Sequence, residues 1–333
     1  MAFFSRLTAR IMQPKIGAAE LSFYAIGKHP GWDDHMPDIG ADNPEVLDFK
    51  QRFYVDAIAG NINSGAWKHL PEPELLPEFN HRFIYWHADV VMHGAIWASS
   101  DGKGRTLYPL IGIVFSRGIN PHAVGSASLS ILNAFRASSQ RTPTADGVKA
   151  AVEDANKSLA ALAPQCPVMD DLIPTLTGAR TAALFDAAPD RQHGARMLYA
   201  LQRSLQHVKA NIANRGDAFY EMVRLPTRAD QSPNGEPGNA LVDWSAWCLS
   251  NIGRSVPILA ASYQGRANDP FTDVIMGSIK TASVFPLRAS REKIPPCIDI
   301  PFELDAAYLA TCDAYLNACR QAGDAPAPLL PLN

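Results

Sequence analysis

Hydrophobic residues in the first third of the chain gather in four short runs that are separated by turn residues. Runs of this length, bounded by Gly, Pro, Asp or Asn, are typical of buried β-strands. The four predicted strands cover residues 21–26, 81–87, 90–97 and 107–115. Because Ala88 and Asp89 alone separate the second run from the third, we expect these two strands to form a hairpin.

A helical repeat occupies the interval between the first and second predicted strands. Asn43 suits the N-cap, Pro44 suits the first helical position, and apolar residues follow at a spacing of three and four. Gly60 is expected to end this helix. After the fourth strand, a stretch rich in Ser, Thr and Gly predicts a loop that leads to a helix near residues 147–162.

The second half of the chain follows a similar order of elements. Its apolar stripes and runs predict helices near 195–212, 241–251 and 304–319, and strands near 256–263, 272–277 and 283–288. Pro226–Gly238 contains several prolines and glycines and is predicted to be a loop. Val274–Ile279 weakly resembles Val91–Ile96, which leaves open both a degenerate internal repeat and a chance similarity.

This order of elements predicts the fold class. Consecutive strands joined by short turns pair antiparallel, whereas a doubly wound nucleotide-binding sheet needs strict alternation of strands and helices. We therefore predict an α/β protein of the α+β type, with a mostly antiparallel sheet flanked by helices, two halves of similar order, and an α/β sandwich. The predicted division is an N-terminal extension at 1–20, a first α/β domain at 21–165, a second at 190–322, and a flexible tail at 323–333.

Composition narrows the classes of function. The 333 residues are 47% hydrophobic and 19% charged, as in an ordinary globular protein, and the net charge of −3 gives no reason to expect nucleic-acid binding. No run approaches the ~18–20 apolar residues of a membrane span, and the N-terminus lacks the core of a signal peptide. Phe3, Phe4, Leu7 and Ile11 share one helical face near basic residues, which leaves a terminal helix and a weak membrane-surface helix as alternatives.

The five cysteines favour a reducing compartment. They contain no Cys-x-x-Cys pair, so neither a zinc knuckle nor a thioredoxin-like motif is predicted. We expect reduced thiols in a cytoplasmic protein that carries no cofactor.

Two turns rich in Gly, Asp and charged residues follow predicted strands. The first covers residues 27–35 and the second residues 99–109. Function in α/β proteins is commonly placed on loops of this kind, at strand ends. The candidate residues of this surface are Gly27, Lys28, Pro30, Trp32, Asp34, Ser99, Asp101, Gly104, Arg105 and Pro109.

Charge pairing is expected to join the two turns. Arg105 follows a tight turn and can fork onto a carboxylate, for which Asp34 and Asp101 are suitable partners. An Arg105–Asp34 pair would make one interaction surface from segments that lie far apart in the sequence. Trp32, inside the first turn, is predicted to be exposed and to act as an interface anchor.

Two groups of residues contain side chains that can ligate a metal ion. The densest set of potential ligands is His29, Asp33, Asp34, His35 and Asp38, but the surrounding Gly and Pro residues favour a turn-building role, so no metal site is predicted. His81, His87 and His93 form a second set. His81 and His87 lie six residues apart on one predicted strand, which separates them by about 20 Å. We therefore expect surface or half-buried histidines that do not share an ion.

The second turn contains residue types that occur in nucleophilic sites and in anion-binding sites. Ser99-Ser100-Asp101 places hydroxyls beside a carboxylate, but no Gly-x-Ser-x-Gly elbow is present. Gly102–Arg105 can present backbone N–H groups and two cations to a phosphate or an acidic protein residue, although turn formation alone also explains this segment.

At these turns the chain resembles the TagF (ImpM) family, accessory proteins of bacterial type VI secretion. The family carries a Gly-Lys-Leu-Pro-x-x-Gly-Asp-Phe stretch and, after a strand, a Ser-x-Asp-x-x-Gly-Arg-x-x-Pro-Leu stretch. The resemblance covers about residues 20–165 and departs from the family at His29, Asp33 and His35 and by one extra residue before Pro109. The matching residues are Gly27, Lys28, Pro30, Asp34, Ser99, Asp101, Gly104, Arg105, Pro109 and Leu110.

The resemblance implies an α/β sandwich without a known catalytic role. It implies a post-translational regulator of type VI secretion that acts through cytoplasmic protein contacts, including a scaffold protein with a forkhead-associated domain. The alternative is a metal-dependent or serine-type hydrolase that uses His29, Asp34 or Ser100 in the cleft between the two turns. A small-ligand site in the second half is a third alternative.

Overall fold

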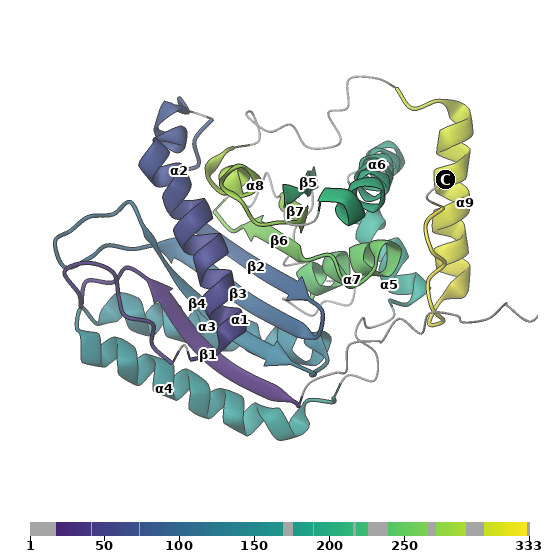
Figure 1. Ribbon diagram of the computed structural model, residues 1–333. Coiled ribbons are helices and arrows are strands. Elements are labelled where there is room, and N and C mark those ends of the chain that lie inside the picture. Colours follow the sequence, from purple (N-terminus) through teal and green to yellow (C-terminus); the bar gives the residue numbers. More distant parts are fainter. Residues whose placement is uncertain are drawn as a thin grey trace, which may run out of the picture.

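Within the part of the chain that the structure describes, one seven-stranded sheet crosses the whole protein (Figure 1). The computed structural model describes residues 18–40, 42–72, 74–168, 176–188, 190–215, 218–225, 239–265, 271–290 and 303–331. Neighbouring strands are antiparallel throughout, in the order β1-β4-β3-β2-β6-β7-β5. The strands are β1 (Glu20–Gly27), β2 (Asn80–His87), β3 (Val90–Ala98), β4 (Pro109–Arg117), β5 (Tyr220–Leu225), β6 (Ile258–Tyr263) and β7 (Thr272–Gly277).

One face of the sheet is covered by the helical segment between β1 and β2, which crosses the front of Figure 1. As predicted, the Asn43 side chain caps this segment by accepting hydrogen bonds from the N–H groups of Glu45 and Val46. The helix passes Gly60, where we had expected it to end, and stops at Gly65, whose φ of +72° suits a left-handed C-cap. The elements on this face are α1 (Pro44–Phe49), the π-helical η1 (Lys50–Ile58), α2 (Ala59–Ser64), η2 (Ala66–His69), α8 (Thr281–Val284) and η5 (Phe285–Arg288).

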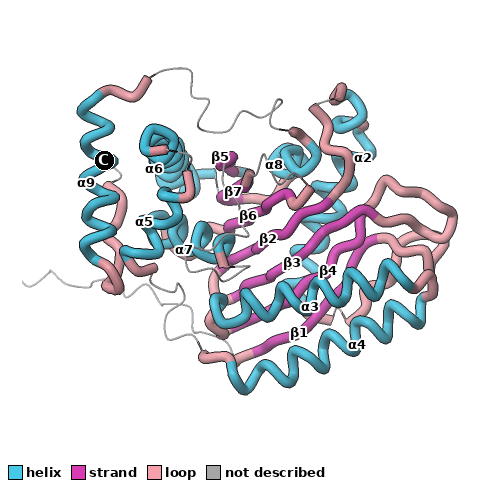
Figure 2. Tube along the Cα trace, turned by 180° about the vertical axis from the view of Figure 1, so that it is seen from behind, coloured by secondary structure: helices cyan, strands magenta, loops and turns pink. Residues whose placement is uncertain are grey.

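The opposite face carries two groups of helices (Figure 2). The first group packs on β1, β3 and β4, and the second packs on the strands of the second half and on β2. The first group is α3 (Pro121–Arg141) and α4 (Ala145–Leu162), followed by the short η3 (Ala163–Gln165). The second group is α5 (Gly178–Asp186), α6 (Arg191–Arg215), α7 (Ala240–Ile252) and α9 (Ala306–Ala322).

Alternate residues of each strand enter these two helical layers. In β2, Phe83 and Tyr85 belong to the core under α1, η1 and α2, whereas Ile84 and Trp86 belong to the core under the helices of the second half. Because both faces are covered, the strands appear in the sequence as continuous apolar runs without polar alternation. The predicted class, a mostly antiparallel sheet between helical layers, is confirmed.

The two halves share this sheet through the pairing of β2 with β6. Six residue pairs, from His81 with Tyr263 to Trp86 with Ile258, form this seam. The weak internal similarity noted in the sequence relates β3 to β7, and each of these strands follows a central strand in a hairpin. The helix after β1 and the helix after β5 cover opposite faces, so the halves differ in their helical layers, and they contribute four and three strands to the sheet. The proposed domain division stays a prediction.

Several predicted elements differ from the structure. The Ser-, Thr- and Gly-rich stretch after β4 forms the 21-residue helix α3, because Val124, Leu132 and Phe135 are buried against the sheet and outweigh the weak helix preference of the polar residues. Residues 283–288 are helical, with Val284 and Leu287 buried, and not a strand. The structure also contains α5 and β5, which were not predicted. Residues 1–17, the predicted loop at 226–238 and Cys297 lie outside the described residues.

The Pro-rich C-terminal segment, expected to be loosely held, makes specific backbone contacts as far as the structure describes it. Gly178 N–H donates to the Ala325 carbonyl, Ala327 N–H donates to the Leu176 carbonyl, and Leu330 N–H donates to the Asn251 side chain. The Leu330 side chain is buried among the second-half helices. Among the described helices, none is long and apolar enough to cross a membrane.

Candidate functional site

The first turn begins where β1 ends, in a backbone conformation that favours glycine. Gly27 has a φ of +121°, and a Cβ atom at this position would lie 2.3 Å from the Pro109 carbonyl oxygen. Lys28 N–H donates to the same carbonyl at 3.1 Å, and Met36 N–H donates to the Gly27 carbonyl at 3.0 Å. The turn is therefore closed on itself and attached to the start of β4.

The second turn is organised around the carboxylate of Asp101. Its Oδ1 accepts hydrogen bonds from the N–H groups of Lys103 and Arg105, at 3.1 and 3.0 Å. Gly104, with a φ of +76°, completes the turn. Asp101 thus supplies from within the chain the anion that we had considered as an external ligand of Gly102–Arg105.

Four charged side chains join the two turns into one network, which we call the turn cluster: Lys28, Asp34, Asp101 and Arg105. Lys28 Nζ lies 2.8 Å from Asp101 Oδ2 and 3.1 Å from Asp34 Oδ1. Arg105 Nε lies 2.6 Å from Asp101 Oδ2, and an Arg105 terminal nitrogen lies 3.2 Å from Asp34 Oδ1. The predicted Arg105–Asp34 pair is present.

Backbone contacts reinforce the link between the turns. The Arg105 terminal nitrogen also donates to the Asp33 carbonyl at 3.0 Å, and Gly102 N–H donates to the Trp32 carbonyl at 2.7 Å. A Cβ atom on Gly102 would lie within 3.2 Å of this backbone, so the close approach of the two turns needs glycine here. Both turns lie at the left of Figure 1, at the end of the sheet where β1 and β3 finish.

Burial divides the turn cluster into an inner and an outer pair. Lys28 and Asp101 are buried, whereas the side chains of Asp34 and Arg105 are 68% and 50% exposed. Loss of solvent acts to raise the pKa of Asp101, but hydrogen bonds from Lys28 and Arg105 outweigh it and hold this pKa below its ordinary value. The hydrogen bond from Lys28 likewise lowers the pKa of Asp34. Both carboxyl groups are therefore ionised at neutral pH.

The remaining predicted surface residues have different surroundings. Trp32 is half-buried, packs on the core under α3 and α4, and makes an edge contact with the His29 ring at 6.0 Å, so it is not the freely exposed anchor that we expected. Pro30 is exposed, Ser99 is half-buried, and Pro109 is buried at the start of β4.

The potential metal ligands of the first turn have separate partners. His29 is buried; its Nδ1 accepts from Gly31 N–H at 3.0 Å and its Nε2 lies 2.9 Å from the Ser139 carbonyl. Asp38 pairs with Lys50, at 2.5 Å. Among the described residues, no group of three His, Cys, Asp or Glu side chains is placed to hold a metal ion.

A recess of about 580 Å³ adjoins the turns on the side of α3. Several hydroxyl groups line it, including those of Ser99 and Ser100, and His29 lies in its wall. Because both ring nitrogens of His29 already bond backbone groups, this imidazole is held in a structural arrangement and not aimed at a serine.

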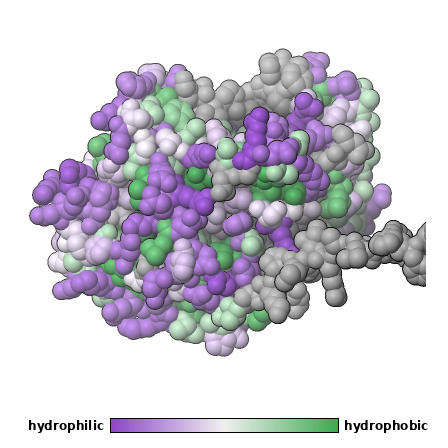
Figure 3. Space-filling view, in the orientation of Figure 1, coloured by the Kyte–Doolittle hydropathy of each residue, from purple (hydrophilic) through white to green (hydrophobic). Residues whose placement is uncertain are grey.

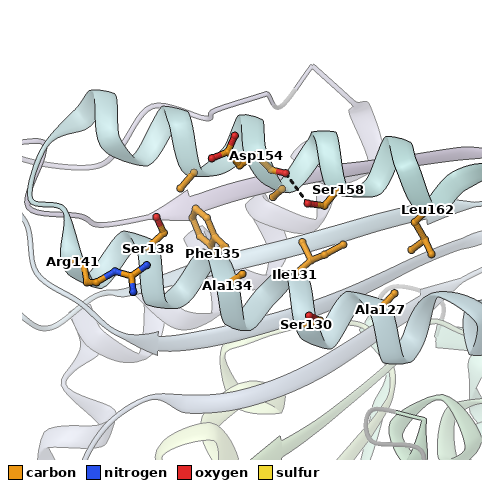
Figure 4. Close-up of a pocket in the computed structure, with 12 residues that line it drawn as sticks. Ala127, Ser130, Ile131, Ala134, Phe135, Ser138, Arg141, Asp154, Ser158 and Leu162 are labelled. Atoms are coloured by element: carbon orange, nitrogen blue, oxygen red, sulfur yellow. Dashed lines mark hydrogen bonds between the residues drawn. The ribbon is translucent and has the colours of Figure 1, made fainter.

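A second hollow, of about 470 Å³, lies between α3 and α4 and contains none of the predicted site residues. Figure 4 shows Ile131 and Phe135 between the two helices, with Asp154 and Ser158 on the opposite wall. The Ser158 hydroxyl donates to the Asp154 carbonyl at 2.9 Å within α4. Small Ala and Ser side chains account for the hollow, and the charged residues in its lining are Arg141 and Asp154.

The strand histidines differ from the prediction. His81 and His93 are buried, 2% and 5% exposed, and only His87 is exposed. His81 lies on the face covered by η1, whereas His93 lies on the face covered by α3, because both faces of the sheet carry helices. His81 and His93 therefore lie on opposite faces of the sheet.

Two buried charge groups were missed by the sequence analysis. Asp243, fully buried at the start of α7, lies 2.7 Å from His122 of α3 and 3.0 Å from Arg180 of α5. Arg224 and Asp273 form a fully buried pair between β5 and β7, with Nε 2.6 Å from Oδ1. The available signal was a lone charge in an otherwise apolar predicted element, Asp243 in the helix near 241–251 and Asp273 in the strand near 272–277, because a buried charge needs a partner.

The contacts of Arg105 and Lys103 lead to a matched prediction within one turn. Arg105→Ala is expected to increase amide hydrogen exchange at Gly102 and Arg105 by about tenfold, because Asp101 and the first turn lose a shared donor. Lys103→Ala is expected to leave both rates unchanged, because Lys103 bonds Asp101 through its backbone N–H and its side chain is exposed. Equal exchange in the two variants would contradict the network described here.

No family model matches the chain, and no curated protein matches it. The crystal structure of PA0076 from Pseudomonas aeruginosa PAO1 is similar to part of the chain, with 18% sequence identity and a TM-score of 0.30. The match covers 44% of this chain and 65% of the PA0076 chain, which is less than two thirds of that protein.

Proposed function

We propose that this protein is a non-enzymatic accessory or regulatory protein of type VI secretion that acts through cytoplasmic protein–protein contacts. The proposal rests on the resemblance of its two turns to the TagF (ImpM) family and on what these turns do in the structure. The expected partners are type VI secretion proteins such as a scaffold with a forkhead-associated domain.

The proposal depends on the different burial of the inner and outer pairs of the turn cluster. Buried Lys28 and Asp101 fix the positions of the turns, and this leaves Arg105 and Asp34 exposed and held in place. A partner that meets side chains already held in one geometry loses less conformational entropy on binding. Arg is also among the residues that most often dominate the energy of an interface.

The hydrogen bonds and ion pairs of the two turns favour protein binding over hydrolysis as the function. The hydrolase alternative would use His29, Asp34 or Ser100. Of these, His29 is already bonded to backbone groups and Asp34 to cations of the chain. A general base must be able to reach the proton of a nucleophile or water, and His29 has no nitrogen left for this. The hydrolase alternative therefore has no specific observation in its favour.

The distribution of hydrophobic residues on the surface also favours protein binding through a few anchoring side chains. On the coloured part of the face seen in Figure 3, hydrophobic residues lie in separate patches among hydrophilic ones. An interface on such a surface depends on a few anchoring side chains and their geometry. The turn cluster supplies anchors of this kind.

Affinity capture with matched variants tests the proposal. Wild-type protein, Arg105→Ala and Lys103→Ala are used as baits in lysate of the native organism, and the recovered proteins are identified by mass spectrometry. We expect wild type and Lys103→Ala to retain type VI secretion components, and Arg105→Ala to retain about tenfold less because an anchoring contact is lost.

Each bait is checked for an unchanged far-UV circular dichroism spectrum and melting temperature. Recovery of the same components by all three folded baits would remove the turn cluster from the interface. Recovery of no secretion component by wild type, together with ester or phosphoester hydrolysis by the purified protein, would replace the proposal with the hydrolase alternative.

A further inference from the structure

A cavity of about 340 Å³ opens beside the turn cluster, on the side of the helical segment η1–α2. Three rings contribute to its wall, from His35 and Tyr108 of the two turns and from Tyr54 of η1. We call this cavity the aromatic pocket. Val55 and Ala59 of the helical segment and Lys50 complete the part of the lining that matters here.

The rings of the aromatic pocket are held in position by one another. The His35 and Tyr108 rings meet edge to face at 5.3 Å, and the Tyr54 hydroxyl lies 3.4 Å from His35 Nδ1. The Tyr108 hydroxyl donates to the Asn63 side chain at 2.9 Å. These contacts join both turns to the helix, so the pocket is preformed.

The π-helical backbone contributes to the shape of the pocket. Ala59 N–H donates to the Tyr54 carbonyl, five residues earlier, in place of the ordinary spacing of four. Segments of this type are rare in helices and are frequently found at functional sites. Here the widened turn carries Tyr54, Val55 and Ala59, which all line the cavity.

The charges around the aromatic pocket disfavour an ionic occupant. Lys28 Nζ lies 4.9 Å from the centroid of the Tyr108 ring, where it already occupies the cation–π position, and it is neutralised by Asp34 and Asp101. Lys50 is itself neutralised by Asp38. Partial burial and the nearby Lys28 lower the pKa of His35, so this ring is uncharged at neutral pH and offers an anion no charge.

The rim of the aromatic pocket favours a side chain of a protein over a free small molecule. Val55, which lines the cavity, is 40% exposed. This apolar side chain would stay in water around a small molecule but would be covered by a protein. The volume is near the lower end of ligand cavities and suits one large side chain.

We propose that the aromatic pocket receives one uncharged aromatic side chain, Phe, Tyr or Trp, of the protein that docks on the turn cluster. The inference rests on the proposed function and adds the chemistry of the partner's anchor. Edge-to-face and offset contacts with Tyr54 and Tyr108 supply the attraction, and the adjacent Arg105–Asp34 pair supplies polar contacts around it. The partner segment therefore combines an aromatic anchor with flanking polar groups.

Side-chain analogues test the chemistry of the pocket directly. The full-length protein is titrated with 3-methylindole, n-butylammonium and acetate, which represent Trp, Lys and Asp, and binding is followed by NMR shifts of the tyrosine rings. We expect saturable binding of 3-methylindole in the millimolar range and no saturation with either ion. Val55→Glu, at an exposed rim position, is expected to weaken the binding of 3-methylindole at least tenfold.

A filled-pocket variant and a matched control extend the test to the partner. Ala59→Phe fills the cavity, whereas Ala137→Phe adds the same side chain to an exposed position on α3. We expect Ala59→Phe to abolish 3-methylindole binding and to reduce capture of the secretion partner about tenfold, with Ala137→Phe equal to wild type.

Three results would overturn the inference: binding of 3-methylindole that Ala59→Phe and Val55→Glu do not change, equal binding of the ions, or unchanged capture by folded Ala59→Phe. The last result, combined with lost capture by Arg105→Ala, would reject the aromatic anchor and leave the proposed function standing.

Discussion

Replacement of Asp273 by Asn is expected to lower the free energy of unfolding by about 3–5 kcal/mol. Arg224 and Asp273 are both fully buried, and two nitrogens of the guanidinium donate to the two carboxylate oxygens at 2.6 and 2.8 Å. Without the carboxylate, the buried cation keeps only neutral partners. The measurement is urea unfolding followed by circular dichroism at neutral pH.

Further contacts of Arg224 shape the expected result of a double replacement. Its guanidinium lies 3.9 Å from the centroid of the Phe271 ring and donates to the carbonyls of Pro286, Ala289 and Ser290. Arg224→Met combined with Asp273→Leu removes both charges but leaves these carbonyls without their donor. We therefore expect the double variant to be more stable than Asp273→Asn and less stable than wild type.

The control for this pair is an exposed ion pair of the same type. Asp186 and Arg320 join α5 to α9 with side chains about half exposed, 52% and 46%. Asp186→Asn is expected to change the free energy of unfolding by less than about 1 kcal/mol. A loss at Asp273→Asn no larger than this would contradict the assigned role of the buried pair.

Acidification from pH 7 to pH 5 is expected to cost the fold about 4 kcal/mol through two buried histidines. Burial lowers the pKa of both His81 and His93 to about 3, with Arg224 and Arg288 adding to the shift of His81 and His122 adding to that of His93. Since the ordinary value is 6.5, the unfolded chain takes up protons first as the pH falls. Stability contributed by the neutral rings is complete above pH 6.5 and is lost between pH 6.5 and 3, at about 1.4 kcal/mol per pH unit for each ring.

Unfolding free energies at pH 5, 6, 7.5 and 8.5 test this pH dependence. Between pH 7.5 and 8.5 the histidine contribution is flat and provides the internal control. His81→Gln and His93→Gln are each expected to remove about half of the slope between pH 6 and 5, whatever their effect on stability at pH 7.5. A slope that persists in the double variant would assign the acid sensitivity to other groups.

Helix starts and tight turns were predictable because each depends on a few residues that are adjacent in the sequence. Asn43 followed by Pro44 marks a helix start, and the two residues between the runs at 81–87 and 90–97 mark a hairpin. The helix α3 was missed for the opposite reason. Its polar Ser residues suggested a loop, and only the burial of Leu132 and Phe135 against a distant sheet stabilises the helix.

The candidate site shows the same contrast. The pairing of Arg105 with Asp34 was predictable for two reasons. Arg105 follows a tight turn that exposes its guanidinium, and the two turns contain few carboxylates that could be its partner. The half-burial of Trp32 was not predictable, because it depends on the packing of the first turn against α3 and α4. The aromatic pocket also needs the helical segment from η1 to α2, whose place beside the turns appears only in three dimensions.

The pairing of β2 with β6 has a consequence for synthesis of the chain. Trp86 leaves the ribosome 172 residues before its partner Ile258, which at about 5–20 residues per second corresponds to about 9–34 s. During this interval the first half can complete its own four strands, but the outer side of β2 has no hydrogen-bonding neighbour. Until the second half is synthesised, the outer edge of β2, with its bulky aromatic residues, therefore has unpaired backbone groups of the kind that favour self-association.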